Sequence, residues 1–213
     1  MGTGIALIVG IPAILIAIVV HEFSHGYAAY LLGDNTAKNA GRLTLNPIAH
    51  IDMWGTIIIP LIMLVTSGAA FGWAKPVPFN PYNLKYPKYG PAIVAIAGPL
   101  SNLIIAFIAL MTFRVLVPTL DPNTNLLMMF LLNLALLNVF LMVFNLVPVP
   151  PLDGSKVLFV IFSDLKYAGF RHALETQGPF ILLTVIILDN FLNLGIFGGL
   201  FKLALSIVYK LLL

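Results

Sequence analysis

The chain has 213 residues, of which 60% are hydrophobic and only 9% are charged, and its mean hydropathy is +1.03. Soluble domains carry about 25% charged residues, so this composition excludes a soluble enzyme, a disordered protein and, despite a net charge of +3, a nucleic-acid-binding protein. The absence of cysteine excludes disulfide frameworks, thiolate metal sites and cysteine nucleophiles. The class that remains is an all-α polytopic membrane protein of one domain.

The predicted elements follow the apolar runs in chain order. A first helix is predicted over 5–32, which is long enough to cross a bilayer. A polar connector follows, with a candidate short strand at 42–45. A second apolar run covers 56–71, and the proline-rich stretch 72–81 is predicted as an extended loop or edge strand, because prolines prevent a helix there.

Further apolar runs cover 91–117, 126–148 and 179–213, and the last is interrupted near 189–195. The whole chain is therefore expected to form five to six transmembrane helices. We divide it into a core, 1–165, and a C-terminal transmembrane region of the same domain, 166–213.

The positions of Lys and Arg indicate how the run 56–71 lies in the membrane. If this run crosses the bilayer, three basic residues lie on one side and seven on the other, with Lys202 inside a helix. If it is a re-entrant segment that returns to its own side, only Arg114 faces the opposite side. The positive-inside rule favours the re-entrant arrangement and makes the other nine cytoplasmic: Lys38, Arg42, Lys75, Lys85, Lys88, Lys156, Lys166, Arg171 and Lys210.

The sharpest motif is His21-Glu22-Phe23-Ser24-His25 in the first predicted helix. Residues four apart share a helix face, so both imidazoles can bind one zinc ion while Glu22 acts on a bound water. A charged residue at the centre of an apolar span costs about 2.5–3.5 kcal/mol unless it has a partner. A metal ion explains these three ionisable groups better than polar helix packing does.

A hydrolytic zinc ion usually has three protein ligands and one open position. The sequence offers these candidates for the third ligand: His50, Asp52, Asp121, Asp153, Asp164, His172, Glu175 and Asp189. Asp153 stands out, because three prolines unwind the end of the preceding helix and Gly154 permits a tight turn. In the re-entrant topology His25 and Asp153 lie at the same depth, whereas in the spanning topology they lie near opposite membrane faces.

The chain resembles the site-2 protease family of intramembrane zinc metalloproteases, in its compact prokaryotic branch without a regulatory domain. The resemblance rests on the segments 21–25 and 98–102 and on 145–154, which is similar to the family's Asn-x-x-Pro-x-Pro-x-Leu-Asp-Gly element. The connectors 41–47 and 71–76 are also similar to this branch.

The resemblance implies that Glu22 is the catalytic base and that one zinc ion per chain is bound by His21, His25 and Asp153. It also implies that Asn102 and Asn145 lie near the site and orient the substrate backbone or the oxyanion. The alternative is that both asparagines are polar contacts between helices. His50 is predicted to be a loop residue that supports the site, in preference to an additional ligand.

The sequence thus predicts a zinc metalloendopeptidase that hydrolyses transmembrane or membrane-buried segments of protein substrates. It is expected to be a multi-pass protein of the cell membrane, surrounded by lipid, with its active site toward the cytoplasm. The extended segment 72–81 is hypothesised to pair with an unwound substrate. A metal-ion transporter or channel with an intramembrane His/Asp site is the alternative, although no internal repeat supports it and transport does not require Glu22.

Overall fold

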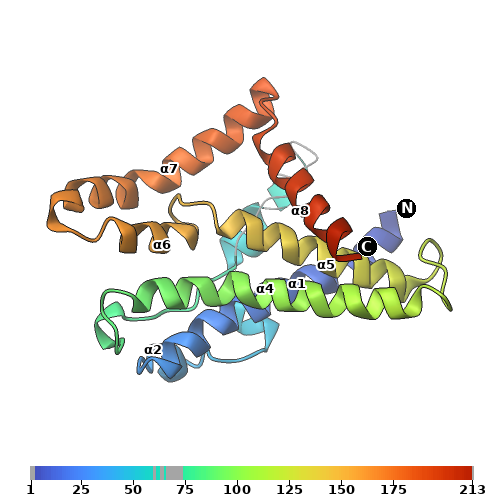
Figure 1. Cartoon of the computed structure of the whole chain (residues 1–213), viewed down its shortest axis with the longest axis horizontal. Helices are drawn as coiled ribbons and strands as arrows, with labels where there is room; N and C mark the ends of the chain where they lie inside the picture. Colours follow the sequence, from blue (N-terminus) through green and yellow to red (C-terminus); the bar gives the residue numbers. More distant parts are fainter. Residues whose placement is uncertain (1–2, 60, 63–64, 66–73, 213) are drawn as a thin grey trace.

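The computed structural model describes residues 3–59, 61–62, 65 and 74–212, and all regular structure in that part of the chain is helical. In chain order, its elements are α1 (Thr3–Leu31), α2 (Thr36–Asn39), η1 (Pro47–His50), η2 (Met53–Ile58), η3 (Pro81–Asn83), α4 (Gly90–Leu116), α5 (Leu126–Asn145), α6 (Gly154–Ile161), η4 (Leu165–Tyr167), α7 (Ala168–Leu192) and α8 (Ile196–Leu212) (Figure 1). The long helices lie close to the apolar runs from which they were predicted.

Three of the described helices, α1, α4 and α5, are long and apolar enough to cross a membrane. Their outer faces carry large apolar side chains, such as Leu7, Ile8 and Val115, which are 59%, 66% and 75% exposed. Such faces are stable only against lipid or another protein. The apolar exterior therefore agrees with the composition of the chain.

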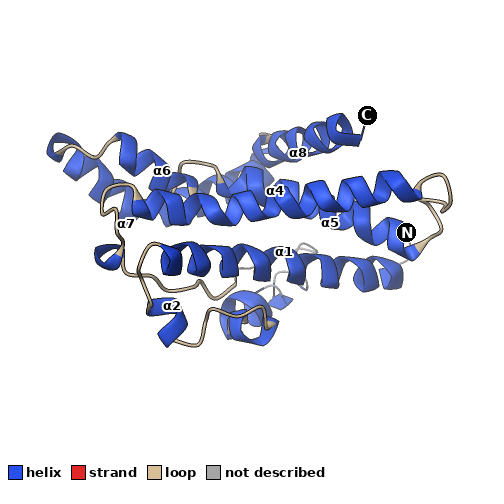
Figure 2. Ribbon diagram, turned by 60° about the horizontal axis from the view of Figure 1, so that its bottom comes forward, coloured by secondary structure: helices blue, strands red, loops and turns tan. Residues whose placement is uncertain are grey.

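Small residues let these three helices pack closely. Ala17, Ala106 and Ala135 are fully buried, and Ala109 is almost so. Without a side chain beyond Cβ, these residues allow helix backbones to approach one another, as in other transmembrane bundles. Helix α8 adds two buried side chains, Ala204 and Val208, to the core that α4 and α5 form, and it runs beside these helices (Figure 2).

Helices α1 and α5 end at the same end of the bundle, and α4 begins there (Figure 1). The Lys85 N–H donates to the Leu32 carbonyl at 2.8 Å, so the connector between α1 and α4 leaves and returns at that end. Arg114 lies in the last turn of α4, toward the opposite end. This arrangement agrees with the loop assignments from charge, whereas the re-entrant segment predicted at 56–71 lies largely outside the described residues.

The strand predicted at 42–45 is wrong. The Arg42 N–H donates to the Ala37 carbonyl at 2.9 Å, and the Thr44 carbonyl accepts from the His50 ring at 2.8 Å. These local hydrogen bonds satisfy backbone groups that a strand would offer to a neighbour. Residues 74–80 form an extended loop, and the described part of the chain contains no strand for it to join.

The predicted interruption in the C-terminal region is confirmed. Asn193, with φ 51°, ends α7 in the left-handed conformation, and Asp189 accepts hydrogen bonds from the N–H groups of Ile196 and Phe197 at 2.7 and 3.1 Å. Helix α7 is continuous through Pro179. Neither α7 nor α8 meets the length and hydropathy of a membrane span that α1, α4 and α5 meet, so the number of crossings stays a prediction.

Candidate metal centre

Helix α1 places His21 and His25 on one face, one turn apart. Their Nε2 atoms are 3.0 Å apart, and the rings meet edge to face with centroids 4.6 Å apart. Both side chains are largely buried, with 9% and 12% of their side-chain surface exposed. The spacing predicted from the sequence therefore gives two convergent imidazole nitrogens.

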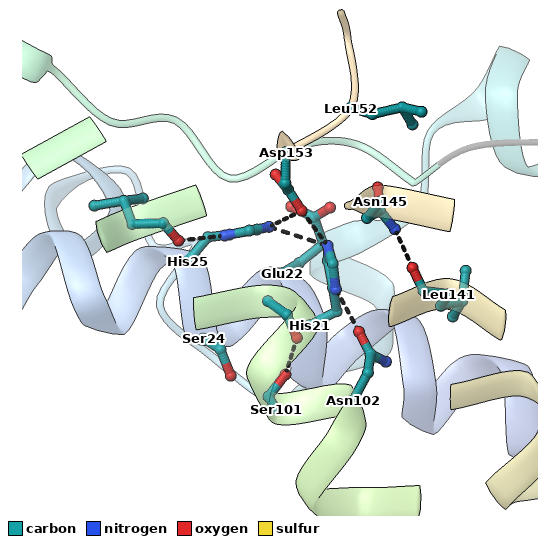
Figure 3. Close-up of polar contacts among 12 residues, drawn as sticks. His21, Glu22, Ser24, His25, Ser101, Asn102, Leu141, Asn145, Leu152 and Asp153 are labelled. Atoms are coloured by element: carbon teal, nitrogen blue, oxygen red, sulfur yellow. Dashed lines mark hydrogen bonds and ion pairs between the residues drawn. The ribbon is translucent and has the colours of Figure 1, made fainter. Parts of the chain in front are cut away.

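Asp153 reaches the same point from the turn between α5 and α6. Its Oδ2 lies 3.2 Å from Nε2 of His21 and 3.3 Å from Nε2 of His25 (Figure 3). Gly154 makes this turn possible, because a Cβ at that position would collide with the carbonyl of Leu146. This is the tight turn that the proline-rich sequence predicts.

The far nitrogen of each imidazole is held by the protein. Nδ1 of His25 lies 2.8 Å from the Val94 carbonyl, which can only accept, so this nitrogen carries the proton. Nδ1 of His21 lies 2.5 Å from Oδ1 of Asn102. The amide orientation of Asn102 is fixed because its Nδ2 donates to the carbonyl of Ala17 at 3.3 Å. In the neutral rings, both Nε2 atoms therefore present lone pairs to the centre.

When both rings are neutral, three acceptor atoms converge here with no donor between them. Burial raises the pKa of the Asp153 carboxyl, but interactions with His21 and His25 lower it by more, so its pKa lies below the ordinary value. Its Oδ2 is buried without a hydrogen-bond partner among the described residues. Acceptors packed in this way require protons or a metal cation to neutralise them.

The spacing of the three atoms fits a metal ion. Bonds of about 2.0–2.1 Å to zinc place two tetrahedral ligand atoms about 3.3 Å apart, and the three pairs here are separated by 3.0, 3.2 and 3.3 Å. His21, His25 and Asp153 are the single group of possible metal ligands that the described residues contain. The other carboxylates and histidines considered from the sequence do not join it.

Gly98 provides the space that the two imidazoles occupy. A Cβ on this residue of α4 would lie 2.5 Å from both Cε1 and Nε2 of His25 and 2.6 Å from Cε1 of His21. Contacts this short are not tolerated by packed side chains. Helix α4 can therefore pass directly beside the candidate ligands only with glycine at this position.

Glu22 is half-buried, and its carboxylate lies beside the centre (Figure 3). Its Oε2 accepts a hydrogen bond from the Val77 N–H at 2.9 Å, so the extended loop 74–80 contacts the candidate base. Nothing in the spacing of residues near Val77 indicates this contact, because it depends on how the connector folds back onto α1.

The two asparagines predicted near the site differ in their surroundings. Asn102 is fully buried and bonded to His21, whereas Asn145 is half-buried and donates to the carbonyl of Leu141 in its own helix at 3.0 Å (Figure 3). His50 is buried in η1, where its Nε2 donates to the carbonyl of Thr44, and it is not part of the candidate ligand group.

Asn138, which was not among the residues predicted from the sequence, extends the polar contacts to a third helix. Its Oδ1 accepts from Nδ2 of Asn102 at 2.8 Å, and its own Nδ2 donates to the carbonyl of Leu134 at 2.7 Å. Both asparagines are fully buried. An amide seven residues before Asn145, on the same face of an apolar helix, is the signal that could have indicated it.

Comparison with protein families matches peptidase family M50 over residues 9–128 and 119–185. Two similar proteins carry the name "Putative zinc metalloprotease". YwhC of Bacillus subtilis (strain 168) is 39% identical over 184 residues, which cover 82% of this chain and 78% of that protein. Rip2 of Mycolicibacterium smegmatis is 27% identical over 179 residues, which cover 84% of this chain and 66% of that protein.

A similarity over a shorter part of the chain is to "Zinc metalloprotease MJ0392" of Methanocaldococcus jannaschii, which is 29% identical over 158 residues. The aligned part covers 74% of this chain but only 35% of that protein. No solved structure matches the chain.

Proposed function

Because the chain belongs to peptidase family M50, we propose that it is an intramembrane zinc metalloprotease that hydrolyses transmembrane or membrane-buried segments of protein substrates. The family and the names of the relatives confirm the resemblance to site-2 proteases and the metalloendopeptidase class predicted from the sequence. With the three apolar helices, they make the chain a membrane protein.

The observation that carries the proposal is the convergence of two imidazole Nε2 atoms and the Asp153 carboxylate beside Glu22. His21, His25 and Asp153 would hold one zinc ion, since their ligand atoms all lie within 4.8 Å of one another. Three protein ligands leave a fourth position for water or substrate, as in other hydrolytic zinc sites. A transport site has no need for the adjacent Glu22.

A zinc ion held there would supply Lewis-acid chemistry, polarising the scissile carbonyl and making a bound water acidic. Glu22 would take the proton of the attacking water and return it to the leaving amine. Because its Oε2 accepts from Val77, Oε1 is the oxygen left to carry that proton. The fixed Nδ1–H groups of His21 and His25 keep both rings turned toward the ion.

Asn102 and Asn145 have different proposed roles. The amide of Asn102 is occupied by His21, Ala17 and Asn138, which supports a role in orienting His21. The Asn145 amide makes fewer hydrogen bonds, because it donates only within its own helix. It is therefore the better candidate to contact the substrate backbone or the oxyanion.

We place the protein in the cell membrane with the centre toward the cytoplasm. At a rise of about 1.5 Å per residue, His25 lies about 9 Å before the end of α1 at Leu31, the end from which the basic connector to α4 begins. A substrate helix would have to unwind at this depth, because its peptide groups are otherwise hydrogen-bonded within the helix. The re-entrant segment at 56–71 belongs to the same proposal.

The test compares wild type with Glu22→Gln after reconstitution into liposomes. Glu22→Gln is expected to retain zinc but to lose cleavage of a model transmembrane substrate by at least about a hundredfold, the contribution typical of a general base. Glu175→Gln, an exposed glutamate of α7, serves as the matched control and should cleave at the wild-type rate. Cleavage by Glu22→Gln at the wild-type rate, or zinc flux without cleavage, would contradict the proposal.

A further inference from the structure

A second group of polar contacts joins Glu22 to a buried cation. Nη2 of Arg42 donates to the carbonyl of Lys75 at 2.7 Å and lies 3.4 Å from the carbonyl of Pro76. The N–H of the next residue, Val77, donates to Oε2 of Glu22 at 2.9 Å. The Pro76 carbonyl and the Val77 N–H belong to one peptide group, so a single peptide separates the guanidinium from the carboxylate.

Arg42 is buried, with 9% of its surface exposed, and buried arginines ordinarily pair with a carboxylate. The ion pairs in the described part of the chain, which includes every Asp and Glu, do not involve Arg42. The backbone carbonyls of 75 and 76 are the acceptors of its side chain there. Its charge is therefore directed at the backbone of this loop.

Two further contacts hold the same loop, one with η1 and one with α1. The Lys75 N–H donates to the His50 carbonyl at 3.0 Å, so both backbone groups of Lys75 are fixed. Gly26 lies one turn after Glu22, and a Cβ there would lie 2.9 Å from Cγ1 of Val77. The missing side chain at Gly26 lets Val77 approach the helix that carries Glu22.

We propose that Arg42 is a positioning residue for the proteolytic reaction, because it fixes residues 75–77 so that the Val77 N–H holds Glu22 in place. A glutamate side chain has several rotatable bonds and loses entropy when it is ordered. A rigid backbone donor on Oε2 orders it and leaves Oε1 for proton transfer. The cation on the Pro76 carbonyl also polarises the shared peptide and strengthens its N–H as a donor.

This inference rests on the proposed function, and its first test separates catalysis from metal binding. Arg42→Met keeps an apolar stem but removes the donors, and we expect kcat to fall at least about tenfold, part of the contribution of a general base. The KM and the zinc content should not change. Arg42→Lys, which restores a cation and donors, should recover kcat toward the wild-type value.

The matched control is Arg171→Met. Arg171 also donates to a carbonyl, that of Phe162 at 2.7 Å, but in the α6–α7 region. This variant should keep the wild-type kcat. An equal fall in kcat for Arg42→Met and Arg171→Met, or a loss of zinc proportional to the loss of activity in Arg42→Met, would overturn the positioning role.

A second measurement does not depend on turnover. In the Glu22→Gln background, whose amide oxygen can still accept, hydrogen exchange at the Val77 amide should become at least about tenfold faster when Arg42→Met is added. Gly26→Ala, which pushes against Val77, should have the same effect, and Arg42→Leu takes the place of Arg42→Met if that variant does not accumulate with zinc. Unchanged Val77 exchange in these variants would overturn the inference, whereas a wild type without proteolytic activity would overturn only the proposed function.

Discussion

At the scale of single residues, Asn138 lies at the end of a hydrogen-bond chain that starts at a candidate ligand. His21 is bonded to Asn102, Asn102 to Asn138, and Asn138 to the Leu134 carbonyl. Groups behind a metal ligand fix its orientation, and their loss typically costs about ten- to a hundredfold in metal affinity. This series of hydrogen bonds therefore links the orientation of a candidate metal ligand to the packing of α1, α4 and α5.

Replacing Asn138 with leucine should weaken zinc binding about tenfold, because Nδ2 of Asn102 then keeps only its longer hydrogen bond, to the Ala17 carbonyl at 3.3 Å, and the amide holds the His21 ring less firmly. The measurement is zinc competition with a chelator of known affinity. Asn133→Leu is the control, since Asn133 donates only to the Met129 carbonyl of its own helix at 3.2 Å. Equal zinc affinities for the two variants would contradict the role of Asn138.

Much of the candidate centre could be predicted from the sequence, because α-helical periodicity brings His21 and His25 together without any tertiary information. Asp153 could be predicted from the prolines and glycine around it. Gly98 and the contact of Val77 with Glu22 could not. Both depend on how closely separate segments approach α1, and local sequence patterns do not encode that distance.

At the scale of elements, Asp34, just after the end of α1, is hydrogen-bonded to the loop before α4. This fully buried carboxylate accepts hydrogen bonds from the Asn80 N–H at 2.7 Å, the Asn83 amide at 3.0 Å and the Thr36 hydroxyl at 2.6 Å. Burial raises the pKa of Asp34, but hydrogen bonds from Thr36, Asn83 and Asn80 lower it by more, so the pKa lies below its ordinary value. Ionised Asp34 therefore stabilises the fold.

A folded-state pKa below the unfolded value gives stability that is present above about pH 3.9, the ordinary pKa of aspartate, and is lost as the pH falls through the folded-state pKa. Asp34→Asn should lower the unfolding free energy by about 1–3 kcal/mol near pH 7. The difference from wild type should shrink below about pH 4. Thermal unfolding in one detergent across this pH range measures both effects.

Asp121→Asn is the control for that experiment, because Asp121 makes similar hydrogen bonds with Asn123 and Thr124 but is exposed, in the loop between α4 and α5. It should change the unfolding temperature less than Asp34→Asn at neutral pH. A pH-independent difference between Asp34→Asn and wild type would show that the carboxylate charge does not contribute.

The elements themselves were largely predictable, with one instructive failure. Continuous apolar runs predict α1, α4 and α5 with nearly their observed bounds, because an apolar run long enough to cross a bilayer indicates both that the element is a helix and where it begins and ends. The segment 42–45 has the alternation of a strand, but Gly41, with φ 65°, turns the chain back and Arg42 bonds to Ala37. A strand needs a neighbour, and sequence alternation alone does not supply one.

At the scale of the whole molecule, orientation in the membrane follows from where the basic loops gather. The segments around α2, just before α4, and between α5 and α7 carry most of the Lys and Arg and lie toward the end of the bundle where α4 begins, while the loop 117–125 lies at the other end (Figure 1). The positive-inside rule supports the proposal that the first end faces the cytoplasm. The candidate zinc ligands are nearer to this end.

Single cysteines can test this orientation, since the chain has no cysteine of its own. A membrane-impermeant maleimide added to intact cells should label Asn123→Cys but not Lys88→Cys, two exposed positions at opposite ends of the bundle. Both should react after permeabilisation. Labelling of Lys88→Cys in intact cells would contradict the cytoplasmic placement of the centre.

The proposed activity depends on one metal ion held jointly by α1 and the turn before α6. The most direct measurement of this claim is the zinc-to-protein ratio of the purified chain, with Asp153→Ala and the control Asp164→Ala beside the wild type. We predict a ratio of about one for wild type and for Asp164→Ala, whose carboxylate is exposed, and a ratio near zero for Asp153→Ala, because two imidazoles alone hold zinc weakly. A wild type without zinc, or Asp153→Ala with the full ratio, would contradict the account.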